Sequence, residues 1–185
     1  MKDFSMYDYT LKAIESSVED LGEVSHISRR DFDERLTFSF SAYVPPLEYV
    51  SLLIETAVLL RTNRAGRVYA GFERLSRMEP IADRFLRIAD VSERVYVFGE
   101  PDWQPPRHPH LRLVHTPPGT PLSREWIVIA DSPTLHVALV AQDLDGFDAP
   151  DLEARRFRAV KTSDPGVVSR LAQAAEDLID SLLPA

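Results

Sequence analysis

The densest group of side chains with catalytic or metal-binding chemistry is a set of histidines in a proline-rich stretch. His108, His110 and His115 follow one another closely, and Glu100 and Asp102 lie just upstream. Imidazole nitrogens and carboxylates bind zinc and other transition metals, and histidine is also a common general base. Zinc ligands must be held rigidly by supporting hydrogen bonds, which a proline-rich loop does not supply. We therefore interpret these histidines as solvated loop residues.

No complete catalytic or phosphate-binding motif occurs elsewhere in the chain. Ser123 is not part of a Gly-x-Ser-x-Gly elbow, and the acidic segment 143–151 lacks the bidentate glutamate of a calcium loop. Glycine-rich phosphate-binding motifs are absent, and the chain has no cysteine, which excludes disulfides and thiolate chemistry. The sequence therefore predicts no catalytic residue and no metal site, and it leaves any cofactor unspecified.

A second group of candidate residues is the basic run at positions 155–158. In an extended strand over 155–160, Arg156 and Arg158 point to one face of the sheet and Arg155 points to the other. Two guanidinium groups on one face could bind an anion, or they could protect an exposed sheet edge from pairing with another chain. We favour the edge, and we keep Arg156 and Arg158 as candidate ligand contacts.

Large aromatic side chains gather near the expected end of a central strand. Phe98 and Gly99 end one predicted strand, Trp103 lies in the proline-rich loop, and Trp126 begins a later strand. In α/β sheets, ligands bind in the crevice beyond the carboxyl ends of the strands. These aromatic residues either share the rim of an apolar pocket there or belong to the core. The predicted ligand contacts are Phe98, Gly99, Asp102, Trp103, Trp126, Arg156 and Arg158.

Hydrophobic periodicity predicts the helices that position these residues. The predicted helices are 6–21, 47–63, 80–89 and one that begins at Asp164–Pro165. The apolar face of the helix 47–63 is broad rather than narrow, which indicates contact with the sheet and with a second surface. We therefore expect Val50, Ile54 and Val58 to form the interface of a homodimer or of a complex with another protein.

Alternating apolar residues and runs of β-branched and aromatic residues predict the strands. The candidate strands are 36–42, 68–72, 94–99, 111–115, 126–131, 135–142 and 155–160. The segments 68–72, 80–89 and 94–99 predict a β-α-β unit, and the three-residue link 132–134 predicts an antiparallel hairpin. The expected fold is a single α/β or α+β domain, with a mixed sheet of about five to six strands flanked by helices.

Charge and composition narrow the classes of function. The formal net charge is −8, from 21 basic and 29 acidic residues, and 44% of the residues are hydrophobic. These values are typical of a globular domain, and a negative protein has little attraction for phosphate backbones. No apolar run is long enough to span a membrane, and the first residues lack the pattern of a signal peptide. We expect a cytoplasmic protein with no membrane and no nucleic-acid partner.

A series of short motifs follows in a characteristic order along the chain. The motifs are Val68–Ser76, Arg94–Gly99 with Pro101–Asp102, Pro121–Trp126 leading into Asp131–Pro133, Arg155–Phe157, and Thr162 with Asp164–Pro165. Their order and spacing resemble the DICT family, sensory domains named for diguanylate cyclases and two-component systems. The resemblance spans about residues 45–180. It implies a DICT-like sensory domain over 45–185, preceded by an N-terminal helix and strand extension over 1–44, in one globular unit.

The resemblance implies a non-enzymatic input module that binds a small ligand or a partner protein. The 185 residues are filled by this one domain, so we expect the module to signal in trans to a separate output protein. The resemblance supplies no established catalytic or ligand residue, and the identity of the ligand and of the output partner stays open.

Two other classes of function remain as alternatives. The first is a small hydrolase or transferase that uses His108, His110 or His115 in the loop 100–126. The second is an interaction protein associated with transcription regulators, with a partly basic face. The arginines that could form that face are Arg61, Arg64, Arg67, Arg74 and Arg77.

Overall fold

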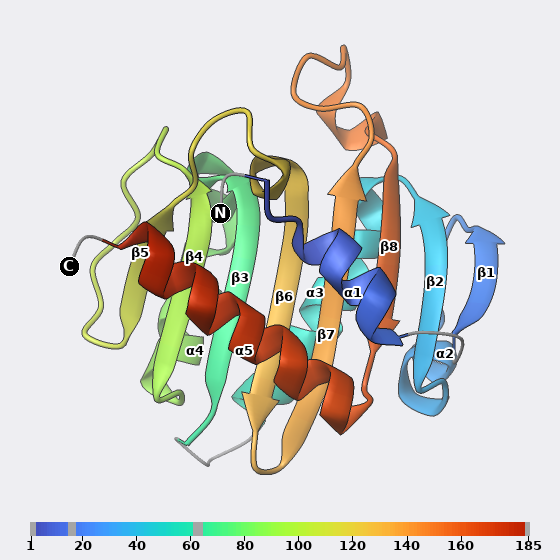
Figure 1. The fold of residues 1–185 in the computed structure, drawn as a ribbon, viewed down its shortest axis with the longest axis horizontal. Helices are drawn as coiled ribbons and strands as arrows, with labels where there is room; N and C mark the ends of the chain where they lie inside the picture. The colour runs from blue at the N-terminus through green and yellow to red at the C-terminus, as the bar shows by residue number, and fades with distance from the viewer. Residues whose placement is uncertain (1–2, 15–17, 61–64, 184–185) are drawn as a thin grey trace.

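A mixed sheet of eight strands forms the centre of the part of the chain that the computed structural model describes, residues 3–14, 18–60 and 65–183. The strand order across the sheet is β1-β2-β8-β7-β6-β3-β4-β5 (Figure 1). The strands are β1 (Glu19–Glu23), β2 (Thr37–Ala42), β3 (Arg67–Arg74), β4 (Arg94–Glu100), β5 (Leu111–His115), β6 (Glu125–Ser132), β7 (Leu135–Asp143) and β8 (Phe157–Thr162). The mixed α and β fold class is therefore confirmed, with eight strands instead of five to six.

Helices cover both faces of this sheet. Figure 1 shows α1 (Met6–Ile14) and α5 (Pro165–Leu182) in front of the sheet, and α3 (Val44–Leu59) and α4 (Ala82–Asp90) behind it. A short helix, α2 (Arg29–Glu34), lies between β1 and β2 in the chain. The remaining turns are the 3₁₀ helices η1 (Leu75–Ile81), η2 (Pro121–Arg124) and η3 (Leu152–Ala154). No helix in the described ranges is long and apolar enough to cross a membrane.

Strand directions agree with the local patterns of the sequence. β3 and β4 are parallel and are connected through η1 and α4, as the β-α-β prediction requires. β6 and β7 form the predicted antiparallel hairpin across a short turn. The last helix begins as predicted, because the Asp164 side chain accepts hydrogen bonds from the backbone N–H groups of Gly166 and Val167.

The core consists of two apolar layers, one on each side of the sheet. Val97 of β4 packs into the layer under α3 and α4, and the next residue, Phe98, packs into the layer under α1 and α5. Neighbouring residues of a strand point to opposite faces, so a strand buried on both sides must be apolar at almost every position. This explains why β3, β4, β6 and β7 read as nearly continuous apolar runs.

The N-terminal helix is shorter than predicted. α1 ends at Ile14, residues 15–17 lie outside the described residues, and 19–23 form the edge strand β1 parallel to β2. The apolar spacing that extended the predicted helix to residue 21 is therefore misleading here. The pairing of Glu19, Asp20 and Glu23 with β2 defines this segment as a strand.

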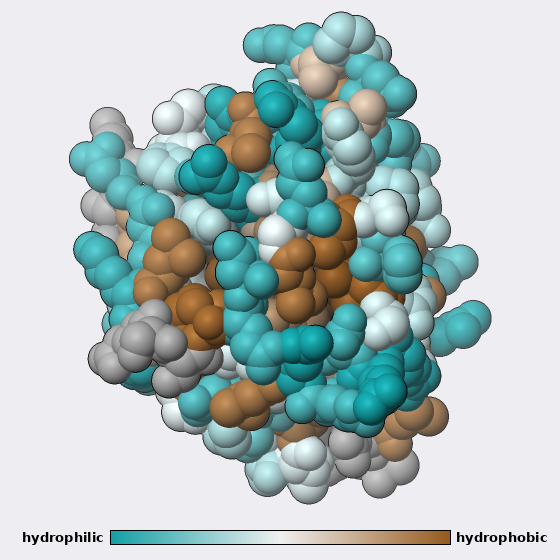
Figure 2. All heavy atoms as spheres, turned by 90° about the vertical axis from the view of Figure 1, so that its right-hand side faces the viewer, coloured by the Kyte–Doolittle hydropathy of each residue, from teal (hydrophilic) through white to brown (hydrophobic). Residues whose placement is uncertain are grey.

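The free edge at β1 is short and acidic. Four of its five residues are exposed, and three of those are Glu19, Asp20 and Glu23. Figure 2 views the molecule from this side, where polar residues interrupt the apolar ones. Short, charged edges resist pairing with other chains. Edge protection therefore comes from β1 and not from the arginines of β8.

The prediction that 155–160 forms an edge strand is wrong. β8 pairs with β2 on one side and with β7 on the other, both antiparallel, so it lies inside the sheet. β2 pairs with the side of β8 that the prediction leaves free, and β1 lies beyond β2 at the edge of the sheet. Sequence periodicity reports which face of a strand is buried, but not how many neighbours the strand has.

The predicted interface on the helix 47–63 is also wrong. Val50, Ile54 and Val58 are buried against the sheet as part of the core, so they are not available to another chain. The helix itself runs from Val44 to Leu59, and residues 61–63 lie outside the described part of the chain. Its outward side still carries apolar residues, of which Leu52 is 40% exposed.

We expect Ile54→Glu to unfold the protein and not merely to change its association state. An unpaired carboxylate at this fully buried position should cost more than about 4 kcal/mol. The measurement is urea unfolding followed by circular dichroism. Leu52→Glu, on the exposed side of the same helix, is the matched control and should leave the midpoint nearly unchanged. A folded Ile54→Glu monomer would contradict the assignment of Ile54 to the core.

Candidate ligand-binding cleft

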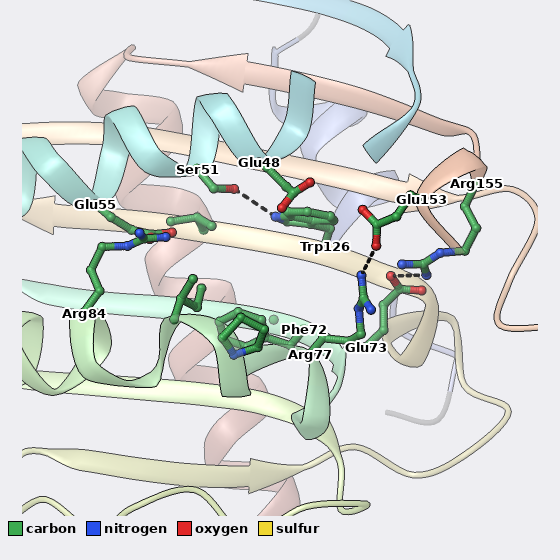
Figure 3. A pocket seen from close by; sticks show the side chains of 14 residues that line it. Glu48, Ser51, Glu55, Phe72, Glu73, Arg77, Arg84, Trp126, Glu153 and Arg155 are labelled. Carbon is green, nitrogen blue, oxygen red and sulfur yellow. Dashed lines mark hydrogen bonds and ion pairs between the residues drawn. The ribbon is translucent and has the colours of Figure 1, made fainter. Parts of the chain in front are cut away.

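A cleft of about 210 Å³ lies on the sheet face that α3 and α4 cover (Figure 3). Two aromatic side chains form its floor, Phe72 of β3 and Trp126 of β6. These residues are direct cross-strand partners, so their side chains point to the same face of the sheet. The indole N–H of Trp126 donates to the Ser51 hydroxyl of α3 at 2.9 Å, which fixes the orientation of the ring.

The two long walls of the cleft carry opposite charge. Glu48, Ser51 and Glu55 recur at helical spacing, so they share one side of α3 and line the cleft from there. Arg77 of η1 and Arg84 of α4 line the opposite wall. The acidic wall therefore faces a basic wall across an apolar floor.

Two ion pairs connect elements that line the cleft. Arg84 Nε lies 2.6 Å from Glu55 Oε1, which joins α4 to α3. Arg77 Nη2 lies 2.9 Å from Glu153 Oε1, which joins η1 to η3. Burial raises the pKa of Glu55 to about 7, although the Arg84 charge and hydrogen bond lower it. A ligand in the cleft would lie between these pairs and would compete with them.

One end of the cleft is closed by a buried charge cluster. Arg155 is 1% exposed, and its Nη1 lies 3.0 Å from Glu73 Oε1 and 2.9 Å from Asp143 Oδ2. Its Nε donates to the backbone carbonyl of Leu152 at 2.8 Å, and the Phe147 ring lies 4.4 Å from the guanidinium carbon. A buried cation needs such compensation on every side, so the cluster fixes the ends of β3, β7 and η3 relative to one another.

The pKa of Glu73 is raised in this cluster. Burial raises its pKa to about 9, the hydrogen bond to Asp143 and the Asp143 charge raise it further, and Arg155 lowers it. Burial also raises the pKa of Asp143, but the hydrogen bond from Glu73, the backbone N–H groups of Gly146 and Asp145, and the Arg155 charge bring it below its ordinary value. Glu73 Oε2 is buried without a hydrogen-bond partner among the described residues, which disfavours the ionised form of this carboxyl.

The backbone at Glu73 is strained. Its φ of +64° is the only positive φ of a non-glycine residue in the described ranges, and the β3–β4 register shifts at this point. Strict alternation along β3 would send Phe72 and Glu73 to opposite faces, yet both line the cleft. The bulge therefore turns Glu73 towards Arg155, at a backbone cost of about 1–3 kcal/mol.

Only one of the predicted ligand contacts lines this cleft, and that residue is Trp126. Phe98 is buried on the opposite face of the sheet, in the layer under α5. Gly99 lies against η1, where a Cβ atom would come within 3.0 Å of the Leu75 backbone nitrogen. Asp102 accepts hydrogen bonds from the backbone and hydroxyl of Ser76, which holds the start of η1.

The other predicted contacts lie outside the cleft. Trp103 packs against the core under α3 and α4 without lining the cleft. Arg156 forms an exposed ion pair with Asp145 at 2.9 Å, and Arg158 lies beside it in a separate groove between β2 and β8. The sequence predicted that Arg155 points to a different face of the sheet from Arg156 and Arg158. It did not indicate that the guanidinium group of Arg155 is buried.

The histidines of the alternative enzyme site have structural partners. His108 Nε2 lies 2.7 Å from Asp90 Oδ1, and His110 Nδ1 lies 3.1 Å from the carbonyl oxygen of Ser92. His115 is an exposed residue of β5. In the described part of the chain, no three His, Cys, Asp or Glu side chains converge as metal ligands.

The basic face of the second alternative is largely neutralised. Arg67 pairs with Glu93 and Glu176, and Arg77 pairs with Glu153. Arg61 and Arg64 lie outside the described residues.

The fold and the cleft define a three-layer α/β/α domain with a lined cleft on one face of its sheet. Residues 48–144, more than half of the chain, match the family model of DICT, described as a sensory domain in diguanylate cyclases and two-component systems. The chain belongs to this family. The match begins at Glu48 on the acidic wall and includes Phe72, Glu73 and Trp126, whereas Glu153 and Arg155 follow it in the chain.

Solved structures with a similar fold are distant in sequence. A polyphosphate kinase from Porphyromonas gingivalis has 13% identity and a TM-score of 0.57, with 87% of this chain and 30% of that chain covered. The archaeal chromatin protein TrmBL2 has 10% identity and a TM-score of 0.48, over 77% of this chain and 52% of that one. No curated protein matches the chain. The likeness to the kinase concerns the fold alone.

We expect Arg155→Met to destabilise the protein by about 3–5 kcal/mol at neutral pH, because the change leaves Asp143 buried without its cation. Urea unfolding measures the loss. Arg156→Met is the matched control. Arg156 pairs with Asp145 at an exposed site, so this substitution should change the free energy of unfolding little. Equal effects of the two substitutions would refute the structural role of the buried cluster.

We expect Glu73→Gln to change the pH dependence of stability. The folded pKa of about 9 exceeds the ordinary value of 4.5, so the stabilisation is present at low pH and is lost as pH rises through 9. The variant has no ionisable group at this position. Its free energy of unfolding should therefore not show the decrease, on the order of a few kcal/mol, that ionisation of Glu73 causes in the unmodified protein. Urea unfolding at acidic, neutral and alkaline pH tests this. The other buried carboxyl groups are present in both proteins and cancel in the comparison. If the free energy of unfolding depends on pH in the same way in both, the pKa of Glu73 is not raised in the folded protein.

Proposed function

We propose that this protein is a non-enzymatic signalling module that binds a small ligand in the cleft and signals in trans to another protein of the cytoplasm. Membership of a sensory family supports a signalling role. The observation that carries the ligand proposal is the construction of the cleft, an aromatic floor between two walls that are joined by ion pairs. A ligand that exchanges these pairs changes how α3, α4 and η3 are held together.

The chemistry of the cleft supports binding more than catalysis. Among the described residues, the Ser51 hydroxyl accepts the indole N–H of Trp126 and makes no hydrogen bond to the neighbouring carboxylates Glu48 and Glu55. Glu55, Glu73 and Glu153 each contact an arginine. Nucleophilic catalysis needs a nucleophile within hydrogen-bond reach of a general base, and the lining residues do not supply that pair.

β6 supplies a route from the cleft to the opposite face of the sheet. Glu125, the residue before Trp126, is buried under α1, and its carboxylate accepts hydrogen bonds from the backbone N–H groups of Met6 and Tyr7 at 2.9 and 3.2 Å. The Ser5 hydroxyl also donates to it. A carboxylate from the sheet thus caps the first turn of α1, where anions are favourable.

We propose that this contact carries the signal. Consecutive residues of a strand lie on opposite faces, so a ligand that moves Trp126 also moves Glu125 and the cap of α1. α1 packs on β7 and α5 through one side, which leaves its other side for a partner. The homodimer interface expected at Val50, Ile54 and Val58 has no place in this proposal, because those residues are buried.

A mixture of small aromatic amines, alcohols and carboxylates tests the proposal by ligand-observed NMR. We expect at least one member to bind, and we expect Trp126→Leu to abolish that binding while Trp103→Leu, outside the cleft, retains it. The bound member should also change the hydrogen exchange of the α1 amides, and Glu125→Gln should remove this change without removing binding. Failure of every compound to bind would refute the ligand cleft. Saturated binding with unchanged α1 exchange would refute the route through β6.

A further inference from the structure

We infer that the cleft takes an organic cation, a small molecule with a flat apolar body and an amine or amidine group that Glu48 recognises. This inference rests on the proposed function, and it adds the chemical class of the ligand. It follows from the charges that line the cleft and from which of them already have a partner.

The basic groups of the cleft are already neutralised. Arg84 is held by Glu55 at 2.6 Å, Arg77 by Glu153 at 2.9 Å, and Arg155 by Asp143 and Glu73. An anionic ligand would have to displace a carboxylate that is fixed to the fold in order to reach any of these guanidinium groups. It would gain one ion pair only by breaking another, which leaves little net attraction.

Glu48 is the acidic group of the cleft that has no such partner. It makes no hydrogen bond or ion pair with another described residue, whereas the other carboxylates of the cleft contact arginines. Glu48 is an exposed residue of α3. Burial of part of its side chain raises its pKa, the nearby Glu153 charge raises it further, and Arg77 lowers it. Four carboxyl groups and three guanidinium groups line the cleft, so Glu48 has no guanidinium group left to balance it. A cation beside Glu48 relieves the repulsion between Glu48 and Glu153.

Trp126 supplies the second half of the recognition. Figure 3 shows Glu48 and Trp126 directed towards the same part of the cleft, below Ser51 and opposite Phe72. A cation over an indole face is attracted by the negative charge of the ring face, and indole is the strongest partner for a cation among the aromatic side chains. Phe72 and Ile81 offer apolar contact to the rest of the ligand. The volume of about 210 Å³ requires a compact molecule.

Three probes with the same phenylethyl body test the charge preference. Phenethylamine is a cation, phenethyl alcohol is neutral and 3-phenylpropionate is an anion at neutral pH. In a Trp103→Phe background, Trp126 is the single tryptophan, so its fluorescence reports the cleft directly. We expect phenethylamine to bind about tenfold more tightly than the alcohol and the anion to bind most weakly. The advantage of the amine should shrink as salt is added.

Glu48→Gln separates the role of this carboxylate from that of the floor. We expect it to remove the advantage of phenethylamine and to leave the affinity for phenethyl alcohol unchanged. Glu34→Gln, the same change of charge on α2 and away from the cleft, is the matched control and should retain the preference. A preference for phenethylamine that survives Glu48→Gln would overturn the assignment of Glu48.

The remaining outcomes distinguish this inference from the proposed function. If phenethyl alcohol or 3-phenylpropionate binds as tightly as the amine in the unmodified cleft, the cation class is wrong and the ligand cleft stands. If none of the three probes perturbs Trp126 and the wider mixture also fails to bind, the proposed function itself is refuted together with the cation class.

Discussion

The buried guanidinium of Arg155 is the interaction on which the cleft depends. It contacts Glu73 at the end of β3, Asp143 at the end of β7 and the carbonyl of Leu152 in η3. A cation without solvent is tolerated only where its partners are fixed around it, so the end of β3, 82 residues away in the chain, must meet the segment from Asp143 to Arg155 at one point. The same requirement explains the left-handed backbone of Glu73, because the bulge of β3 brings its carboxyl to the guanidinium.

The cleft is built against this fixed end. Phe72 and Trp126 are held by the register of β3 and β6, whereas the charged walls belong to α3, η1, α4 and η3. Close-packed sheet residues shift together and not independently, so a displacement of Trp126 passes along β6. In the proposed function, occupancy of the cleft produces such a displacement. The position of Glu125 and Trp126 on opposite faces of β6 gives that displacement a path to α1.

Much of the fold was predictable because local patterns report local burial. The alternation Leu-Thr-Phe-Ser-Phe-Ser-Ala predicted β2, the short link at 132–134 predicted the hairpin of β6 and β7, and Asp164–Pro165 predicted the start of α5. The order of motifs predicted the family, which the match over 48–144 confirms. Trp126 is the one residue of the cleft that the sequence analysis predicted as a ligand contact. It was a candidate because a large aromatic residue at the end of a strand lies either in the core or at the rim of a pocket. Ser51 and Glu55 interrupt the apolar side of α3, which was a usable signal for the acidic wall.

Local sequence patterns were enough to predict most of the helices and strands, the fold class and the family. They do not show that β8 lies inside the sheet, that Val50 and Ile54 face the sheet and not a partner, or that β1 forms the edge, all of which follow from the folded chain. The folded chain also decided that Glu73, Asp143 and Arg155 meet, and that Phe98 and Trp126 lie on opposite faces. The difference lies in the range of the interactions. Periodicity and capping act over a few neighbouring residues, whereas β2 and β8 pair residues 125 positions apart and the ion pair of Arg155 with Glu73 joins residues 82 positions apart.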